Sequence, residues 1–166
     1  MSALGQSLST ADLSDRYPDA QAAEPMFLSF GGLEAFHGQI ETLKVFEDNA
    51  MVRTVLEESG LGRILVVDGG GSRRCALVGG ALGELAVTNE WKGVVVYGCV
   101  RDTDQLRATR VGIRAIGAHP RKSTKGLHAG RTGLSLAFAG IRFSRGDWLY
   151  ADADGILVSR EPLHLS

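Results

Sequence analysis

The stretch from Gly79 to Asp102 contains three groups that can hold a small acid. A glycine pair, Gly79 and Gly80, opens a helical pattern, and the free amides at a helix start bind anions. Arg101 can donate two parallel hydrogen bonds to a carboxylate, and Asp102 offers a hard oxygen ligand to a divalent cation. These residues predict a site that holds a carboxylated substrate against a metal ion.

Each of these features also has a structural interpretation. Small residues in a helix commonly serve close packing, and an isolated Arg–Asp pair is more often a surface ion pair. The position of Arg101 and Asp102 favours a site, because they follow the apolar strand expected at 93–98. The carboxyl ends of parallel strands border the ligand crevice of α/β folds, and the helix start should open on the same edge.

A second glycine-rich turn, DGGGSRR at 68–74, also follows a strand and precedes a helix. It lacks the lysine and Ser or Thr of a P-loop, and Arg74 stands where a dinucleotide motif has its third glycine. We interpret it as a tight structural turn, with Arg73 and Arg74 facing solvent or a partner.

The middle of the chain alternates strand and helix, which predicts parallel pairing. The expected elements there are a helix at 48–60, a strand at 63–71, a helix at 75–91, a strand at 93–98 and helical turns within 101–109. Before them we expect a helix at 9–17 and strands at 25–30 and 36–45. Short β segments follow residue 111, interrupted by a long loop at 119–133. The sequence predicts one α/β domain over 1–166 with a β-rich C-terminal half.

Composition fits a globular protein: 44% of the 166 residues are hydrophobic and 22% are charged. A net charge of −1 gives no global argument for nucleic acid or membrane. Residues 101–145 nevertheless carry ten basic and two acidic side chains. This is either a solvated surface or a site for an anionic ligand or an acidic neighbouring subunit; RNA is disfavoured because stacking aromatics are not interleaved.

Other residue types exclude several kinds of site. Cys75 and Cys99 form no disulfide framework or zinc motif and should be buried free thiols. The four histidines have no ligand spacing, and Trp91 and Trp148 fit the core or an interface. Without an apolar signal core or an apolar run of membrane-spanning length, we expect a soluble, cytoplasmic protein that binds no membrane and no nucleic acid directly.

Four segments resemble the RraA-like family: STADLSDRY, VVDGGGSRRCALVGG, NEWKGVVVYGCVRD and GDWLYADADGILVS. That family includes the bacterial regulator of ribonuclease E activity and the class II 4-hydroxy-4-methyl-2-oxoglutarate aldolases. The resemblance runs from Thr10 to Pro162. It implies a compact α/β fold with a layered β/β/α core, assembled as a homotrimer with sites at subunit interfaces.

The resemblance also implies roles for single residues. The substrate's pyruvyl end would lie on the backbone amides of Gly79, Gly80, Ala81 and Leu82. Arg101 would clamp the substrate, and Asp102 would ligate Mg²⁺ or Mn²⁺, mostly through water. The implied chemistry is retro-aldol cleavage or decarboxylation of a small 2-oxo acid, in which the cation and Arg101 stabilise an enolate of pyruvate without a Schiff-base lysine.

Two departures from the aldolase pattern stand beside this resemblance. Gln105 occupies a position that is usually acidic in the aldolases, and Gly80 occupies another. The chain also lacks a C-terminal extension found in some aldolases. NEWKG with YGCVR is closer to the regulator branch, whereas the Arg101–Asp102 pair is closer to the enzymes.

Three hypotheses follow. The first is a divalent-metal-dependent, pyruvate-releasing lyase of the aldolase or oxaloacetate decarboxylase type. The second is a non-catalytic protein that binds and inhibits a ribonuclease E-type endoribonuclease. The third is a trimer that binds an unrelated small anion.

Overall fold

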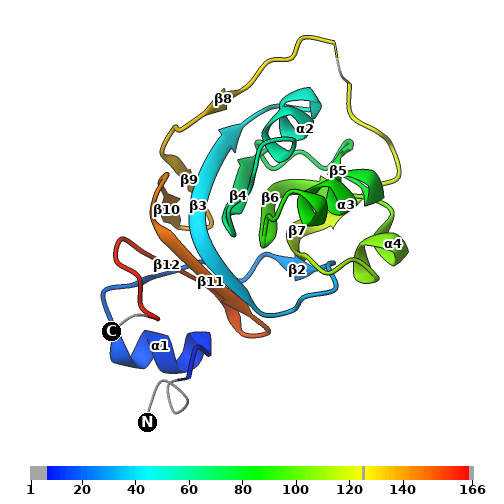
Figure 1. The fold of residues 1–166 in the computed structure, drawn as a ribbon. Coiled ribbons are helices and arrows are strands. Elements are labelled where there is room, and N and C mark those ends of the chain that lie inside the picture. The colour runs from blue at the N-terminus through cyan, green and yellow to red at the C-terminus, as the bar shows by residue number, and fades with distance from the viewer. Residues whose placement is uncertain (1–6, 125, 165–166) are drawn as a thin grey trace.

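Four parallel strands form the centre of the computed structural model, which describes residues 7–124 and 126–164 (Figure 1). In chain order the elements are α1 (Thr10–Arg16), β1 (Gln21–Ala22), β2 (Leu28–Ser29), β3 (Phe36–Lys44), α2 (Ala50–Leu56), β4 (Ile64–Asp68), β5 (Ala76–Val78), α3 (Gly80–Thr88), β6 (Gly93–Val100), α4 (Thr103–Arg107), β7 (Gly112–Ala118), β8 (Arg131–Thr132), β9 (Leu136–Phe138), β10 (Ile141–Phe143), β11 (Trp148–Asp152) and β12 (Gly155–Ser159). The central strands lie in the order β3, β4, β6, β7.

The central strands are apolar on both faces, so both faces must be covered. Alternate side chains of β4 point to opposite sides. Leu65 and Val67 pack with α2 and α3 in one cluster, whereas Ile64 and Val66 pack with the β9–β10 hairpin in another. The resulting order of hairpin, sheet and helices confirms the layered β/β/α core.

Antiparallel strands extend the sheet on both sides. β11, β12 and β1 continue it beyond β3, and β2 lies against β7 at the other edge. Figure 1 shows the long β3 curving across the molecule between these two parts. α1 begins after Ser9, whose side chain accepts a hydrogen bond from the Asp12 amide, and it packs through Leu13 on β11 and β12. The β-rich C-terminal half is therefore confirmed.

The prediction of one helix over 75–91 was wrong in its first part. Residues 76–78 form β5, which pairs in parallel with the end of β6, and the helix begins only at Gly80. The apolar triplet suits either element, and pairing with β6 decides between them. Other elements are shorter than expected: α2 ends at Leu56, β2 covers two residues, and β8 lies inside the expected loop.

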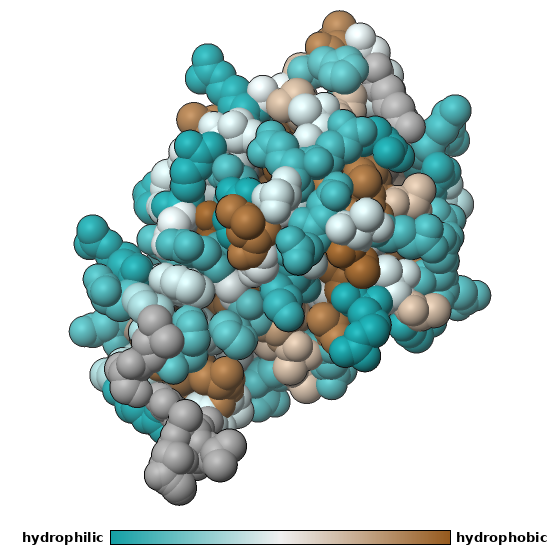
Figure 2. Space-filling model, viewed as in Figure 1, coloured by the Kyte–Doolittle hydropathy of each residue, from teal (hydrophilic) through white to brown (hydrophobic). Residues whose placement is uncertain are grey.

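The remaining expectations concern burial. Cys75 and Cys99 are buried free thiols, and burial raises the pKa of both. Trp91 lies in the core. Figure 2 shows a face that is mostly hydrophilic, with its hydrophobic side chains in separate small patches. Within the described residues, no helix is long and apolar enough to cross a membrane.

Candidate active site

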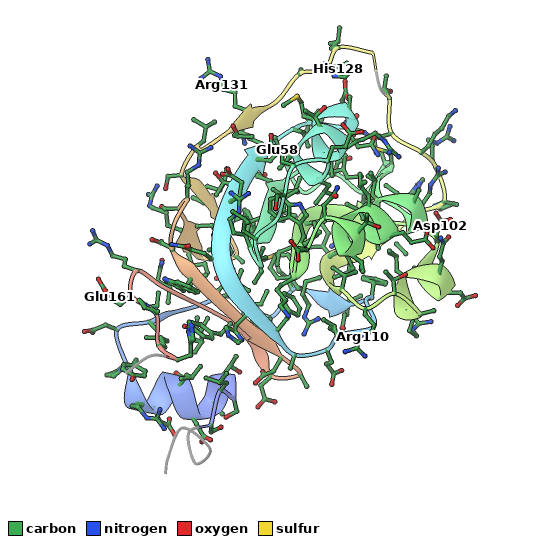
Figure 3. All side chains as sticks on the ribbon, in the orientation of Figure 1. Glu58, Asp102, Arg110, His128, Arg131 and Glu161 are labelled. Carbon is green, nitrogen blue, oxygen red and sulfur yellow. The ribbon has the colours of Figure 1, made fainter. Side chains whose placement is uncertain are left out.

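Five segments meet around one small pocket: β5, the start of α3, the turn after β6, α2 with the residue before it, and the loop after β7. Its volume is about 90 Å³. Figure 3 shows Asp102 on this side of the molecule, beside α3 and α4. The pocket is lined by Asn49, Arg53, Ala76, Gly79, Ala81, Leu82, Arg101, Asp102, Lys122 and Ser123. The structure thus brings together the predicted site residues, with Gly80 buried directly beneath them.

Asp102 is turned towards α3 by its own backbone. It precedes α4 in a left-handed conformation (φ 57°, ψ 46°), which aspartate adopts more readily than most residues. Its side chain does not cap α4; instead Oδ2 accepts a hydrogen bond of 2.9 Å from the Gly80 amide. Among the described residues nothing pairs with Oδ1. The carboxylate therefore faces the positive end of α3 and keeps one oxygen open.

Gly79 is a glycine because Arg101 and Asp102 approach it closely. A Cβ at this position would lie 2.8 Å from Asp102 Oδ2 and 3.4 Å from Arg101 Cγ. The backbone of Gly79 is extended, so contact and not conformation imposes the glycine. The amides of Ala81 and Leu82 lie in the first turn of α3, where backbone N–H groups have no acceptor within the helix. They are therefore available to an anion in the pocket.

The side-chain amide of Gln105 occupies the space next to the Cα atom of Gly80. A Cβ on Gly80 would collide with the side-chain amide of Gln105. Gln105 Nε2 in turn donates a hydrogen bond of 3.1 Å to Glu84 Oε1. The two departures from the aldolase pattern are thus linked, because the Gln105 amide fills the place that an acidic side chain at position 80 would need.

Arg101 is held at the rim by the loop after β7. Its backbone amide donates to the Val78 carbonyl at 2.9 Å, and Nη1 donates to the Pro120 carbonyl at 3.3 Å. Its other guanidinium donors have no acceptor among the residues described. Arg101 can therefore bind a carboxylate while the loop fixes its orientation.

Sequence analysis did not identify Asn49, Arg53, Lys122 and Ser123 as site residues. Asn49 precedes α2, but its side chain does not cap the helix: Asp48 Oδ1 accepts from the Ala50 amide, and Asn49 Nδ2 donates to the Leu77 carbonyl at 3.0 Å. Asn49 Oδ1 and Ser123 Oγ are buried and have no hydrogen-bond partner in the described structure. Two orphaned polar atoms in one pocket indicate a polar ligand. The only sequence signal for these residues was the basic composition of the loop at 119–133. Lys125 of that loop lies outside the described residues.

The charges of the pocket suit an anion together with a cation. Three cationic residues, Arg53, Arg101 and Lys122, and a single carboxylate, Asp102, line the pocket. In the described part of the chain, no group of three or more His, Cys, Asp or Glu residues converges to enclose a metal. One carboxylate with water and substrate oxygens is nevertheless a common way to bind Mg²⁺. The residues therefore fit a cation held loosely by Asp102 and completed by substrate.

The comparison with known protein families decides the ancestry of this fold and pocket. The family model described as RraA-like: Aldolase/RraA matches residues 10–158. The chain belongs to the RraA-like family. A relative from Burkholderia mallei (strain SAVP1), provisionally named 4-hydroxy-4-methyl-2-oxoglutarate aldolase, is 56% identical over 160 residues, which are 93% of this chain and 96% of the relative.

Two solved structures share the RraA-like fold. The RNA-processing inhibitor RraA from Thermus thermophilis superposes with a TM-score of 0.91 at 48% identity, over 95% of each chain. A structure from Geobacillus kaustophilus HTA426, titled as an S-adenosylmethionine: 2-dimethylmenaquinone methyltransferase, has a TM-score of 0.92 at 43% identity. This superposition covers 95% of the present chain and 98% of the Geobacillus chain. These similarities confirm the family and fold that the motifs predicted.

Proposed function

We propose that this protein is a divalent-metal-dependent lyase that releases pyruvate from 4-hydroxy-4-methyl-2-oxoglutarate or a related 2-oxo acid such as oxaloacetate. One observation carries the proposal: Arg101, Asp102 and the first amides of α3 converge on a pocket with two orphaned buried polar atoms. The aldolase name of the Burkholderia relative supports the same chemistry.

In this proposal the substrate's first carboxylate and its 2-oxo group lie between Arg101 and the start of α3, where the amides of Ala81 and Leu82 are available; the Gly80 amide already donates to Asp102. A cation held by Asp102 through water would supply a positive charge next to the 2-oxo oxygen. During cleavage the C4 hydroxyl gives its proton to solvent water and becomes the carbonyl of the second product, while the C3–C4 bond breaks and the electron pair of that bond forms the enolate of pyruvate. Arg101 and the amides are fixed before the reaction, so they stabilise this charge without reorganising. C3 then takes up a proton, and no net proton is consumed.

The test is pyruvate release by the purified protein, followed with lactate dehydrogenase and NADH. Both substrates are supplied with Mg²⁺, with Mn²⁺ or with EDTA. We expect release that requires a metal. Borohydride added with pyruvate should not modify Lys122, because the proposed route needs no Schiff base. Metal-independent release, or trapping at Lys122, contradicts the proposed chemistry.

The oligomeric state and location belong to this proposal. We infer a cytoplasmic homotrimer, with the pocket at the contact between subunits. Sedimentation should give a species of three times 17.7 kDa, the mass of one chain. A stable monomer at assay concentration contradicts the interface model of the site.

A second candidate is inhibition of a ribonuclease E-type enzyme. It is favoured by the 48% identity and close superposition with the RNA-processing inhibitor RraA. A protein that releases no pyruvate with any divalent metal, yet slows cleavage of RNA by ribonuclease E, supports this candidate over the lyase.

A further inference from the structure

Arg53 places a second arginine at the pocket, on a different element from Arg101. It lies in α2, whereas Arg101 follows β6, and both residues line the same cavity. α2 and α3 are packed against each other in one hydrophobic cluster, so the core fixes the backbone position of Arg53 relative to the α3 amides, and its exposed side chain extends from there.

Arg53 has no ion-pair partner in the described part of the chain. Glu57 lies four residues later, a spacing at which opposite charges on a helix commonly pair, yet no ion pair joins the two. The guanidinium thus remains available to a ligand carboxylate, for which its planar pair of donors is well shaped.

Ser123 gives an independent indication of a polar ligand in the same pocket. Its residue is 5% exposed, and its hydroxyl has no hydrogen-bond partner among the described residues. Leaving such a group unpaired is unfavourable in the absence of a ligand. A substrate whose far end carries hydroxyl and carboxylate oxygens would supply the missing partner.

The charge of the pocket indicates how many carboxylates that substrate has. Three cationic side chains less one carboxylate give a formal charge of +2. A divalent cation at Asp102 raises this excess further. A ligand with one carboxylate leaves most of the excess uncompensated, whereas a carboxylate at each end neutralises more of it and occupies both arginines.

We propose that Arg53 binds the distal carboxylate and makes the site selective for 4-hydroxy-2-oxo acids with a carboxylate at both ends. This inference rests on the proposed lyase function and adds the residue that recognises the distal carboxylate of the substrate. Arg101 and the α3 amides hold the end that leaves as pyruvate. Arg53 holds the carboxylate that remains on the second product after the C3–C4 bond breaks.

Two substrates that differ only at the distal end test this assignment. 4-Hydroxy-4-methyl-2-oxoglutarate is cleaved to two pyruvates, whereas 4-hydroxy-4-methyl-2-oxopentanoate has a methyl group in place of the distal carboxylate and is cleaved to pyruvate and acetone. kcat/KM is measured for both with the wild type, Arg53→Gln and Arg110→Gln. Arg110 is a matched control because it is exposed and does not line this pocket; Figure 3 shows it well separated from Asp102.

Arg53→Gln should lower kcat/KM for the dicarboxylate roughly thirtyfold, the typical effect of losing hydrogen bonds to a charged group. The monocarboxylate should change less than about twofold, and Arg110→Gln should affect neither substrate. Exchange of the pyruvate methyl protons with deuterium from solvent should be the same in wild type and Arg53→Gln, because pyruvate has no distal carboxylate.

Equal losses on both substrates, or no loss on the dicarboxylate, would overturn the assignment of Arg53 while leaving the lyase intact. A wild-type protein that neither cleaves the two substrates nor exchanges pyruvate protons contradicts the lyase itself, and the assignment fails with it. If the protein exchanges pyruvate protons but cleaves the two substrates equally well, the lyase stands and only the assignment of Arg53 fails.

Discussion

The turn after β4 and the turn after β6 both place an aspartate beside glycines and arginines at one edge of the sheet. After β4, Asp68 accepts hydrogen bonds from Lys44 Nζ at 3.0 Å and from the Gly70 amide at 2.8 Å. Arg74 of the same turn forms an ion pair with Glu47 at 2.7 Å. These charged groups find their partners within the chain.

The turn after β6 leaves comparable groups open. The Asp102 carboxylate accepts a single described hydrogen bond, from the Gly80 amide, and the Arg101 side chain donates one, to the Pro120 carbonyl. Asn49 Oδ1 and Ser123 Oγ are buried nearby without partners among the described residues. Because native proteins pair their buried polar groups, unmet hydrogen-bonding capacity distinguishes a binding site from a structural turn of similar composition.

Among the substitutions at residues other than Asp102, Arg101→Lys should have the largest effect. Lysine keeps the charge but cannot donate two parallel hydrogen bonds to a carboxylate. We expect turnover to fall on the order of a hundredfold. Arg74→Lys in the other turn should leave turnover unchanged, because Arg74 pairs with Glu47 and lies over the Phe46 ring and does not line the pocket. Equal turnover in wild type and Arg101→Lys identifies Arg101 as an ordinary surface residue.

Gly79→Ala and Gly70→Ala should separate activity from stability. A methyl group at position 79 displaces the Asp102 carboxylate, so kcat/KM should fall roughly tenfold with little change in unfolding. Gly70 has φ +70°, where alanine is strained by about 1 kcal/mol. Gly70→Ala should therefore lower the melting temperature and keep turnover per folded molecule. Full activity in Gly79→Ala shows that Asp102 does not need its observed position.

Gln105→Glu should have the smallest effect, a few-fold decrease in the metal concentration that gives half-maximal activity. The new carboxylate lies near the proposed cation, where outer oxygen groups strengthen metal binding. It also approaches Glu84, so the double variant Gln105→Glu/Glu84→Gln should show the effect without charge repulsion. If neither variant changes the metal requirement, Gln105 does not face the cation.

Much of the fold could be predicted from sequence because the central strands are continuous apolar runs. ILVV at 64–67 and GVVVYG at 93–98 are typical of buried strands, their alternation with helices predicts parallel pairing, and Arg101 and Asp102 follow the second of them. β5 could not be predicted, because a three-residue apolar segment carries no period of its own and takes its structure from pairing with β6.

The pocket could be predicted only in part. Gly79, Arg101 and Asp102 lie on consecutive elements, so their meeting follows from strand order. Asn49 and Ser123 come from segments far away in sequence, and only the packed chain brings them to the same place. The left-handed backbone of Asp102, which turns its carboxylate towards α3, likewise has no signature in the residue types around it.

The central claim is that the turn after β6 performs chemistry and the turn after β4 does not. The most direct test compares Asp102→Ala with Asp68→Ala for metal-dependent pyruvate release and for thermal unfolding. Asp102→Ala should abolish pyruvate release and stay folded, with a loss of stability no larger than that of Asp68→Ala, because it loses only the hydrogen bond from the Gly80 amide. Asp68→Ala should lose about 1 kcal/mol of stability and keep its turnover at a temperature where it is folded. Retained pyruvate release in a folded Asp102→Ala protein would contradict the account.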